Sequence, residues 1–212
     1  MKFCADCLKL YAVTDRRWLK GISLPQAVEE AVKSGVTMVQ LREKNMDFEE
    51  FTALAREVKK VTDKYKVPFV INDNVAVALA CDADGVHVGQ SDMCAFDVRA
   101  KIGPEKILGV SARTTDQAML AAKMGADYVG IGAVFSTGTK NDAEQLSLAE
   151  VKKICAAVPL PAVAIGGITK SNITMLKGSG ADGAAVVSAI FAADNIASAA
   201  AELRVLADEI TR

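Results

Sequence analysis

The chain has 212 residues, a formal net charge of −1 and 51% hydrophobic residues. This charge excludes the basic surface that nucleic-acid binding requires. No apolar stretch reaches the ~18 to 20 residues of a membrane span, and the first residues lack the apolar segment of a signal peptide. Five cysteines without disulfide-like spacing are typical of a reducing compartment, so we expect a cytoplasmic protein.

A short apolar strand followed by an amphipathic helix recurs eight times along the chain. We expect strands at residues 8–13, 38–41, 68–71, 85–88, 107–110, 128–134, 161–165 and 183–187. We expect helices at residues 24–33, 48–65, 75–81, 95–101, 115–124, 148–157, 173–178 and 195–210. Four strand entries resemble one another, at residues 34–37, 82–85, 125–128 and 180–183. Eight such units without a linker predict an α/β fold, a single-domain (β/α)8 TIM barrel over residues 1–212.

Polar side chains follow several of the expected strands. Barrel enzymes carry their chemistry at the C-terminal ends of the strands, because the loops there form one rim. The charged and hydroxyl residues at these ends are Arg42, Lys44, Asp73, Asp92, Ser111, Thr137, Thr139 and Lys140. Their gathering over consecutive strand ends indicates a functional site rather than a chance set of solvated loops.

Two carboxylates, Asp73 and Asp92, follow the neighbouring third and fourth strands. Neighbouring strands lie about 4.8 Å apart, and carboxylates held so close repel unless a cation or proton lies between them. We favour Mg²⁺, which takes one or two carboxylates and completes its shell with phosphate and water. A general acid/base pair is the alternative interpretation. Arg42, Lys44 and Lys140 on the same rim favour a pyrophosphate as the ligand.

A second anion site is predicted at the ends of the seventh and eighth strands, at 166–168 and 187–188. Barrels commonly bind a phosphate there on backbone N–H groups, and glycine lets the backbone approach the anion. The hydroxyls of 137–139 adjoin this site. The residues thus predict small phosphorylated partners, a Mg²⁺-pyrophosphate beside a monophosphate. Without a strong nucleophile between them, the site suits departure of pyrophosphate, with catalysis by positioning and charge stabilisation.

Two further features give little support for a metal or catalytic site. Cys4 and Cys7 form a lone C-x-x-C, whereas a structural zinc needs two further ligands and the chain has one histidine. That histidine, His87, lies in a run typical of a buried strand. We therefore expect it to be a hydrogen-bonded structural residue rather than part of a site.

Short motifs stand at the strand ends in a fixed order. They are Gln40-Leu41-Arg42-Glu43-Lys44, Asn72-Asp73, His87-Val88-Gly89-Gln90-Ser91-Asp92, Gly109-Val110-Ser111, Thr137-Gly138-Thr139-Lys140, Ala164-Ile165-Gly166-Gly167-Ile168 and Val187-Ser188-Ala189-Ile190. In this order they resemble the thiamine-phosphate synthase family over essentially the whole chain. That family joins hydroxymethylpyrimidine pyrophosphate to thiazole phosphate, which gives thiamine phosphate and pyrophosphate. The chain departs from the usual family pattern at Ala133 and Ser136, where the family carries proline.

The resemblance implies a role for each motif position. The pyrimidine half would contact Gln40 and Ser111. The pyrophosphate would be held by Arg42, Lys44, Asn72 and Lys140, and Mg²⁺ by Asp73 and Asp92. The thiazole phosphate would be held by Thr137, Gly138, Thr139, Gly167, Val187 and Ser188, while Leu41 and Glu43 complete the first substrate-binding motif. The implied catalytic residues are Arg42, Lys44, Ser111 and Lys140, and pyrophosphate would leave before the thiazole nitrogen attacks the pyrimidine cation.

Three other functions remain as alternatives. A thiazole tautomerase of the same fold is similar but generally lacks the Arg42-x-Lys44 pair and the metal carboxylates. A regulator would bind thiamine precursors without catalysis. A phosphosugar isomerase or epimerase would need a catalytic carboxylate or histidine and no pyrophosphate site. The sequence leaves the oligomeric state open, with a homo-oligomer as one alternative.

Overall fold

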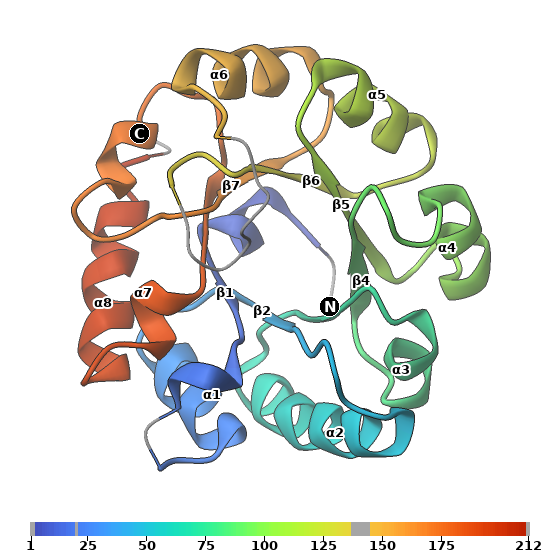
Figure 1. The fold of residues 1–212 in the computed structure, drawn as a ribbon, viewed down its shortest axis with the longest axis vertical. Coiled ribbons are helices and arrows are strands. Elements are labelled where there is room, and N and C mark those ends of the chain that lie inside the picture. The colour runs from blue at the N-terminus through green and yellow to red at the C-terminus, as the bar shows by residue number, and fades with distance from the viewer. Residues whose placement is uncertain (1–2, 20, 137–144, 211–212) are drawn as a thin grey trace.

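The computed structural model describes residues 3–19, 21–136 and 145–210, which form a closed barrel ringed by helices (Figure 1). The strands are β1 Leu10–Val13, β2 Met38–Leu41, β3 Phe69–Asn72, β4 Gly85–Val88, β5 Ile107–Ala112, β6 Tyr128–Gly132, β7 Ala162–Ile165 and β8 Gly183–Val186. Each strand pairs in parallel with the next, and β8 closes the barrel against β1. The expected single-domain (β/α)8 barrel is confirmed.

The helices follow the strands with few departures from expectation. They are η1 Ala5–Leu8, η2 Arg16–Trp18, α1 Leu24–Lys33, α2 Phe48–Tyr65, α3 Val75–Ala80, α4 Ala95–Ile102, α5 Thr115–Lys123, α6 Leu148–Ala157, η3 Ile173–Leu176, α7 Ser188–Phe191 and α8 Ile196–Ala207. The helix expected at 173–178 is only the 3₁₀ turn η3, which ends at Leu176 because Lys177 takes a non-helical ψ of 129°. The short helix α7 directly after β8 was not expected.

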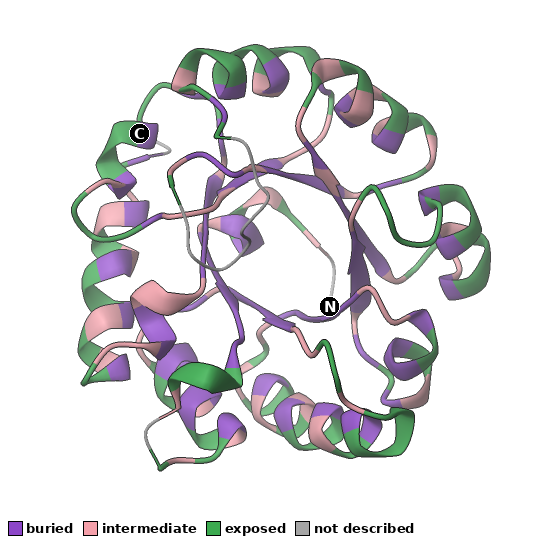
Figure 2. Cartoon of the chain, viewed as in Figure 1, coloured by how far each residue is buried: buried purple, intermediate pink, exposed green. Residues whose placement is uncertain are grey.

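Strand alternation separates two buried layers. Successive strand side chains point to opposite faces, so Tyr11 and Met38 lie inside the barrel while Leu10 and Val39 pack outward against the helices. Figure 2 shows the strands buried over most of their length and the helices buried on their inner sides; Ser111, Gly132 and Ile165, near the C-terminal ends of their strands, are intermediate. The same alternation decides which residues near the strand ends face the interior.

The four similar strand entries perform one structural task at the N-terminal rim. They place Thr37, Asp84, Asp127 and Asp182 just before β2, β4, β6 and β8. Each side chain accepts a backbone N–H from the preceding strand, in the pairs Leu10–Thr37 (2.9 Å), Phe69–Asp84 (2.8 Å), Leu108–Asp127 (2.7 Å) and Ala162–Asp182 (2.8 Å). The backbone N–H of each entry residue donates in return to the carbonyl of the same partner. The sequence repeat is therefore a hydrogen-bonding unit that fastens the strands in pairs around this rim.

Candidate active site

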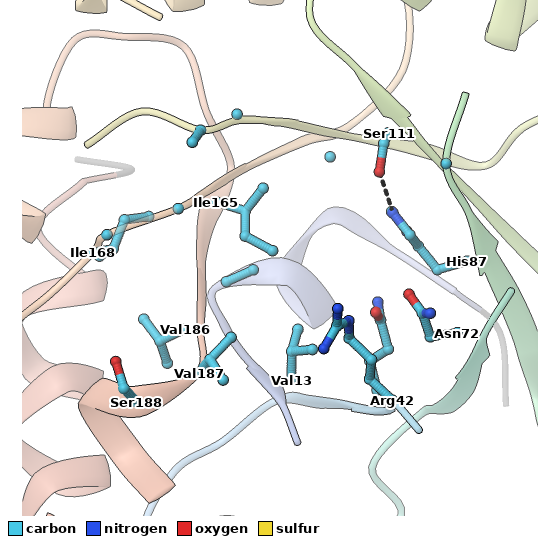
Figure 3. Close-up of a pocket in the computed structure, with 18 of the residues that line it drawn as sticks. Val13, Arg42, Asn72, His87, Ser111, Ile165, Ile168, Val186, Val187 and Ser188 are labelled. Carbon is cyan, nitrogen blue, oxygen red and sulfur yellow. Dashed lines mark hydrogen bonds between the residues drawn. The ribbon is translucent and has the colours of Figure 1, made fainter. Parts of the chain in front are cut away.

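A cavity of about 630 Å³ opens at the C-terminal end of the barrel. Its lining includes these residues expected from the sequence: Gln40, Arg42, Lys44, Asn72, Asp73, Asp92, Ser111, Gly167, Val187 and Ser188. Figure 3 shows Arg42, Asn72 and Ser111 on one side of the cavity and Ile168 and Ser188 on the other. Apolar side chains of the strands lie between these two sides, so the cavity has two polar ends joined by an apolar wall.

The carboxylates Asp73 and Asp92 lie together, as expected. Burial, a hydrogen bond with Asp73 and repulsion by its charge raise the pKa of Asp92. The Asp92 Oδ2 accepts the Gly89 N–H at 2.7 Å, while the Asp73 Oδ2 accepts Lys44 Nζ at 2.8 Å and Asn72 Nδ2 at 2.5 Å. Two carboxylates whose negative charges repel each other provide the oxygen ligands that suit a hard cation such as Mg²⁺.

The backbone at Asp73 is held in an uncommon conformation. Its φ of 62° lies in the left-handed region, which costs a residue other than glycine roughly 1–2 kcal/mol. The Asp73 N–H donates to the His87 carbonyl at 2.8 Å, and the next N–H donates to the Asn72 carbonyl at 2.7 Å. The end of β3 thereby turns Asp73 toward the loop that follows β4. Strain of this kind is commonly found at functional sites.

Three cations line the same cavity as the carboxylate pair. Arg42 and Lys44 follow β2, and Arg113 follows β5; all three line the cavity. The Arg42 N–H donates to Thr14 Oγ1 at 3.1 Å, which fixes the start of the loop after β2. Three cations against two carboxylates favour a polyanionic ligand at this end of the cavity.

The opposite end of the cavity is built from backbone. After β7, Gly166 and Gly167 take φ values of 105° and 62°, and a β-carbon on Gly167 would overlap the carbonyls of Phe135 and Ser136. The Gly167 carbonyl accepts Asn172 Nδ2 at 2.9 Å, which holds the turn. This turn and the first residue of α7 both lie at the cavity, in the place where barrels commonly bind phosphate.

Two expected substrate contacts, Leu41 and Glu43, turn their side chains away from the cavity, and their role in substrate binding stays a prediction. Leu41 follows Gln40 by one residue, so alternation points it out of the barrel, and it is fully buried in the outer layer against the helices. Glu43 turns away to Arg16, whose Nε donates to its Oε1 at 2.8 Å. Neither residue lines the cavity.

Four other expected residues lie outside the described part of the chain. They are Thr137, Gly138, Thr139 and Lys140. Their assigned roles stay predictions.

The cavity also holds residues that the sequence interpretation assigned elsewhere or passed over: Trp18, His87, Gln90 and Arg113. His87 is buried and hydrogen-bonded, as expected, and its ring also borders the cavity. A signal was present in the sequence: in the run Val86-His87-Val88, strand alternation points His87 to the face opposite the two valines. The register pairs His87 with Asn72, which places both side chains on the inner face of the sheet.

The fold and this cavity define a barrel enzyme that acts on small phosphorylated molecules. Within the described residues, no helix is long and apolar enough to cross a membrane.

The comparisons with known proteins specify the class further. The family model for thiamine monophosphate synthase matches residues 10–190. A thiamine-phosphate synthase of Clostridium tetani is 50% identical over 198 residues, 93% of this chain and 94% of that one. One from Clostridioides difficile is 52% identical over 190 residues, 90% of each chain. The solved structure of a thiamine phosphate pyrophosphorylase from Pyrococcus furiosus has a TM-score of 0.90 at 39% identity, covering 97% of this chain and 98% of that one. The chain belongs to the thiamine monophosphate synthase family and is a transferase.

Proposed function

We propose that the chain joins hydroxymethylpyrimidine pyrophosphate to thiazole phosphate, forming thiamine phosphate and releasing pyrophosphate, in the cytoplasm and as one catalytic domain over residues 1–212. The observation that carries this proposal is the cavity itself. It has cations and paired carboxylates at one end and a glycine turn at the other. Two phosphorylated substrates fit such a cavity with their reacting carbons and nitrogens between the ends. The five free cysteines support a reducing compartment.

At the cationic end, Arg42, Lys44 and Asn72 hold the pyrophosphate, with Lys140 as a further proposed partner. The hydrogen bonds that these residues donate become stronger as negative charge grows on the departing oxygen. They therefore stabilise the transition state more than the bound substrate. The residues that would hold Mg²⁺ are Asp73 and Asp92, and the ion would supply charge neutralisation at the pyrophosphate. Lys44, Asn72 and the Gly89 N–H orient these two carboxylates.

At the opposite end, Gly167, Val187 and Ser188 hold the thiazole phosphate, with the proposed help of residues 137–139. Gln40 and Ser111 hold the pyrimidine between the two ends. Both substrates are then fixed within reach of each other, which removes much of the entropic cost of a two-substrate reaction.

The order of bond changes is pyrophosphate departure followed by capture. The bond between the pyrimidine methylene carbon and the pyrophosphate oxygen breaks, and its electron pair leaves with pyrophosphate. The thiazole nitrogen then donates its lone pair to the methylene cation. Among the described lining residues no cysteine occurs, and the only carboxylates are the paired Asp73 and Asp92, which supports a path without a covalent enzyme intermediate. Val13, Ile165 and Val187 present apolar surface that keeps water from the cation.

One assay tests the proposal. The purified chain is incubated with both substrates, with and without Mg²⁺, and thiamine phosphate and pyrophosphate are quantified. We expect equal amounts of the two products. A regulator would bind both substrates and form neither product, whereas a tautomerase would change only the thiazole compound.

A further inference from the structure

A network of buried hydrogen bonds crosses the barrel beneath the cavity. It joins Gln40 of β2 to Ser111 of β5 through Tyr11, Tyr128 and His87. Gln40 Nε2 donates to the Tyr11 hydroxyl at 2.6 Å, the two tyrosine hydroxyls lie 2.8 Å apart, and His87 contacts Tyr128 through Nδ1 and Ser111 through Nε2, each at 2.9 Å. Figure 3 shows the last of these bonds at the cavity wall. We call these five residues the buried network.

The buried network has a direction. A hydroxyl and a neutral imidazole each have one hydrogen to donate. Tyr11 accepts from the Gln40 amide, so its own hydrogen goes to Tyr128; in the opposite sense it would lack an acceptor among the hydrogen bonds of the described residues. Tyr128 then donates to Nδ1 of His87. The imidazole therefore carries its hydrogen on Nε2 and donates it to Ser111.

Packing holds the network in place. Both tyrosines are almost fully buried, with 1% or less of their surface exposed. A β-carbon on Gly109 would overlap the Tyr128 ring and lie 2.5 Å from His87 Nδ1, so glycine at this position makes room for both rings. Burial raises the pKa of both tyrosines, so their hydroxyls keep the hydrogens that the network uses.

We propose that His87, Tyr128 and Tyr11 are positioning residues. They fix which hydrogen-bond donor of Ser111 and which acceptor of Gln40 face the pyrimidine. Ser111 already accepts from His87, so its own hydrogen is available to donate into the cavity. Gln40 turns its amide nitrogen to Tyr11, which leaves the amide oxygen as an acceptor. A matching ring carries a bare nitrogen toward Ser111 and an amino group toward Gln40, as an aminopyrimidine does. This assignment of the ligand rests on the proposed function.

The direction can be measured without substrate, because His87 is the one histidine of the chain. Nitrogen-15 labelling of histidine gives one pair of ring signals. In the free protein we expect a bare Nδ1 and a protonated Nε2, the tautomer that the hydrogen bonds to Tyr128 and Ser111 require. A protonated Nδ1, or exchange between the two forms, would overturn the assignment.

Two variants and a control extend this measurement. Tyr128→Phe removes the donor to Nδ1, and we expect His87 to lose its fixed tautomer; a spectrum like that of the wild type would count against the network. Tyr65→Phe removes a hydroxyl that contacts Glu29 at 2.8 Å on the outside of the barrel. This control is expected to keep the wild-type spectrum. Tyr11→Phe leaves the Tyr128–His87 bond in place, so the tautomer should persist while Gln40 becomes free to turn.

Substrate discrimination gives the second readout. A pyrimidine with an oxo group in place of the amino group presents an acceptor to Gln40. We expect the wild type to prefer the amino substrate by about 10³-fold or more in kcat/KM, as sites built on hydrogen bonds do. In Tyr11→Phe this ratio should fall at least ~10-fold, since one unmet hydrogen bond costs about that much. An unchanged ratio would overturn the positioning role. If the wild type forms no thiamine phosphate, the proposed function fails, whereas the tautomer measurement still decides the network.

Discussion

Aspartates at the two ends of the barrel do opposite things. At the N-terminal rim, Asp84, Asp127 and Asp182 each accept a backbone N–H from the preceding strand at 2.7–2.8 Å. At the C-terminal rim, Asp73 and Asp92 face each other, and the pKa of Asp92 is raised. The same side chain stabilises the fold where it accepts a backbone N–H of the neighbouring strand, whereas the backbone N–H that Asp92 accepts belongs to Gly89 of its own loop. Aspartate prepares a cation site where it meets a second carboxylate, so stability and chemistry are separated along the barrel axis.

The largest effect is expected from Asp92→Ala. Its loss removes half of the proposed metal site, which should lower kcat by about 10³-fold or more, equivalent to several kcal/mol of transition-state stabilisation. The free energy of unfolding should change little, because the residue is largely exposed and the relief of repulsion by Asp73 offsets the lost hydrogen bond from the Gly89 N–H. Steady-state kinetics and urea denaturation measure the two quantities. An Asp92→Ala variant that is unstable but fully active would show that this carboxylate stabilises the fold and does not take part in the chemistry.

The next effect concerns the chemistry at the C-terminal rim. A pyrimidine substrate whose methyl group carries fluorines should react at least ~100-fold more slowly, because electron withdrawal destabilises the methylene cation and each 1.36 kcal/mol is tenfold in rate. Single-turnover rates, measured after binding has been confirmed, give the comparison. Equal rates for both substrates would exclude the order in which pyrophosphate leaves first.

The N-terminal rim is tested by Asp127→Ala. This variant loses the bond from the Leu108 N–H at 2.7 Å and the ion pair with Arg99 at 2.7 Å. We expect a loss of about 1–3 kcal/mol in the free energy of unfolding, because a strand N–H is left without its acceptor. Asp182→Ala is a matched variant at the equivalent position. At a temperature where both variants are folded, kcat should match the wild type; a large fall in kcat would show that this rim takes part in the chemistry.

The smallest effect is expected from replacing Cys4 and Cys7 together by serine. Their sulfurs lie 3.7 Å apart, and the described residues contain no group of three or more His, Cys, Asp or Glu side chains placed to hold a metal. Activity and metal content should therefore match those of the wild type. Stoichiometric zinc in the wild type that disappears in the double variant would contradict this.

The sequence predicts the barrel well because its strand and helix periods repeat eight times, and α1, α2 and α6 have the expected bounds. It is less reliable for single side chains. A strand-end motif does not show which neighbour faces inward, so Gln40 and Leu41 looked equivalent until register and alternation separated them.

Long-range contacts could not be predicted from the sequence either. The bonds that join Tyr11, Tyr128 and His87 connect residues 41 to 117 positions apart. Only the closed barrel brings them together, and no local pattern in the sequence reports such a contact. The site was therefore predictable at its rim but not at its floor.

The most direct test of the account is the magnesium dependence of product formation. Thiamine phosphate is measured in a single preparation after EDTA treatment and then during titration with Mg²⁺. We expect no turnover in EDTA, full recovery with Mg²⁺, and little or no recovery in Asp92→Ala at the same concentrations. Undiminished turnover in EDTA would contradict the assignment of Asp73 and Asp92 as Mg²⁺ ligands. It would also contradict the separation of stability and chemistry between the N-terminal and C-terminal rims.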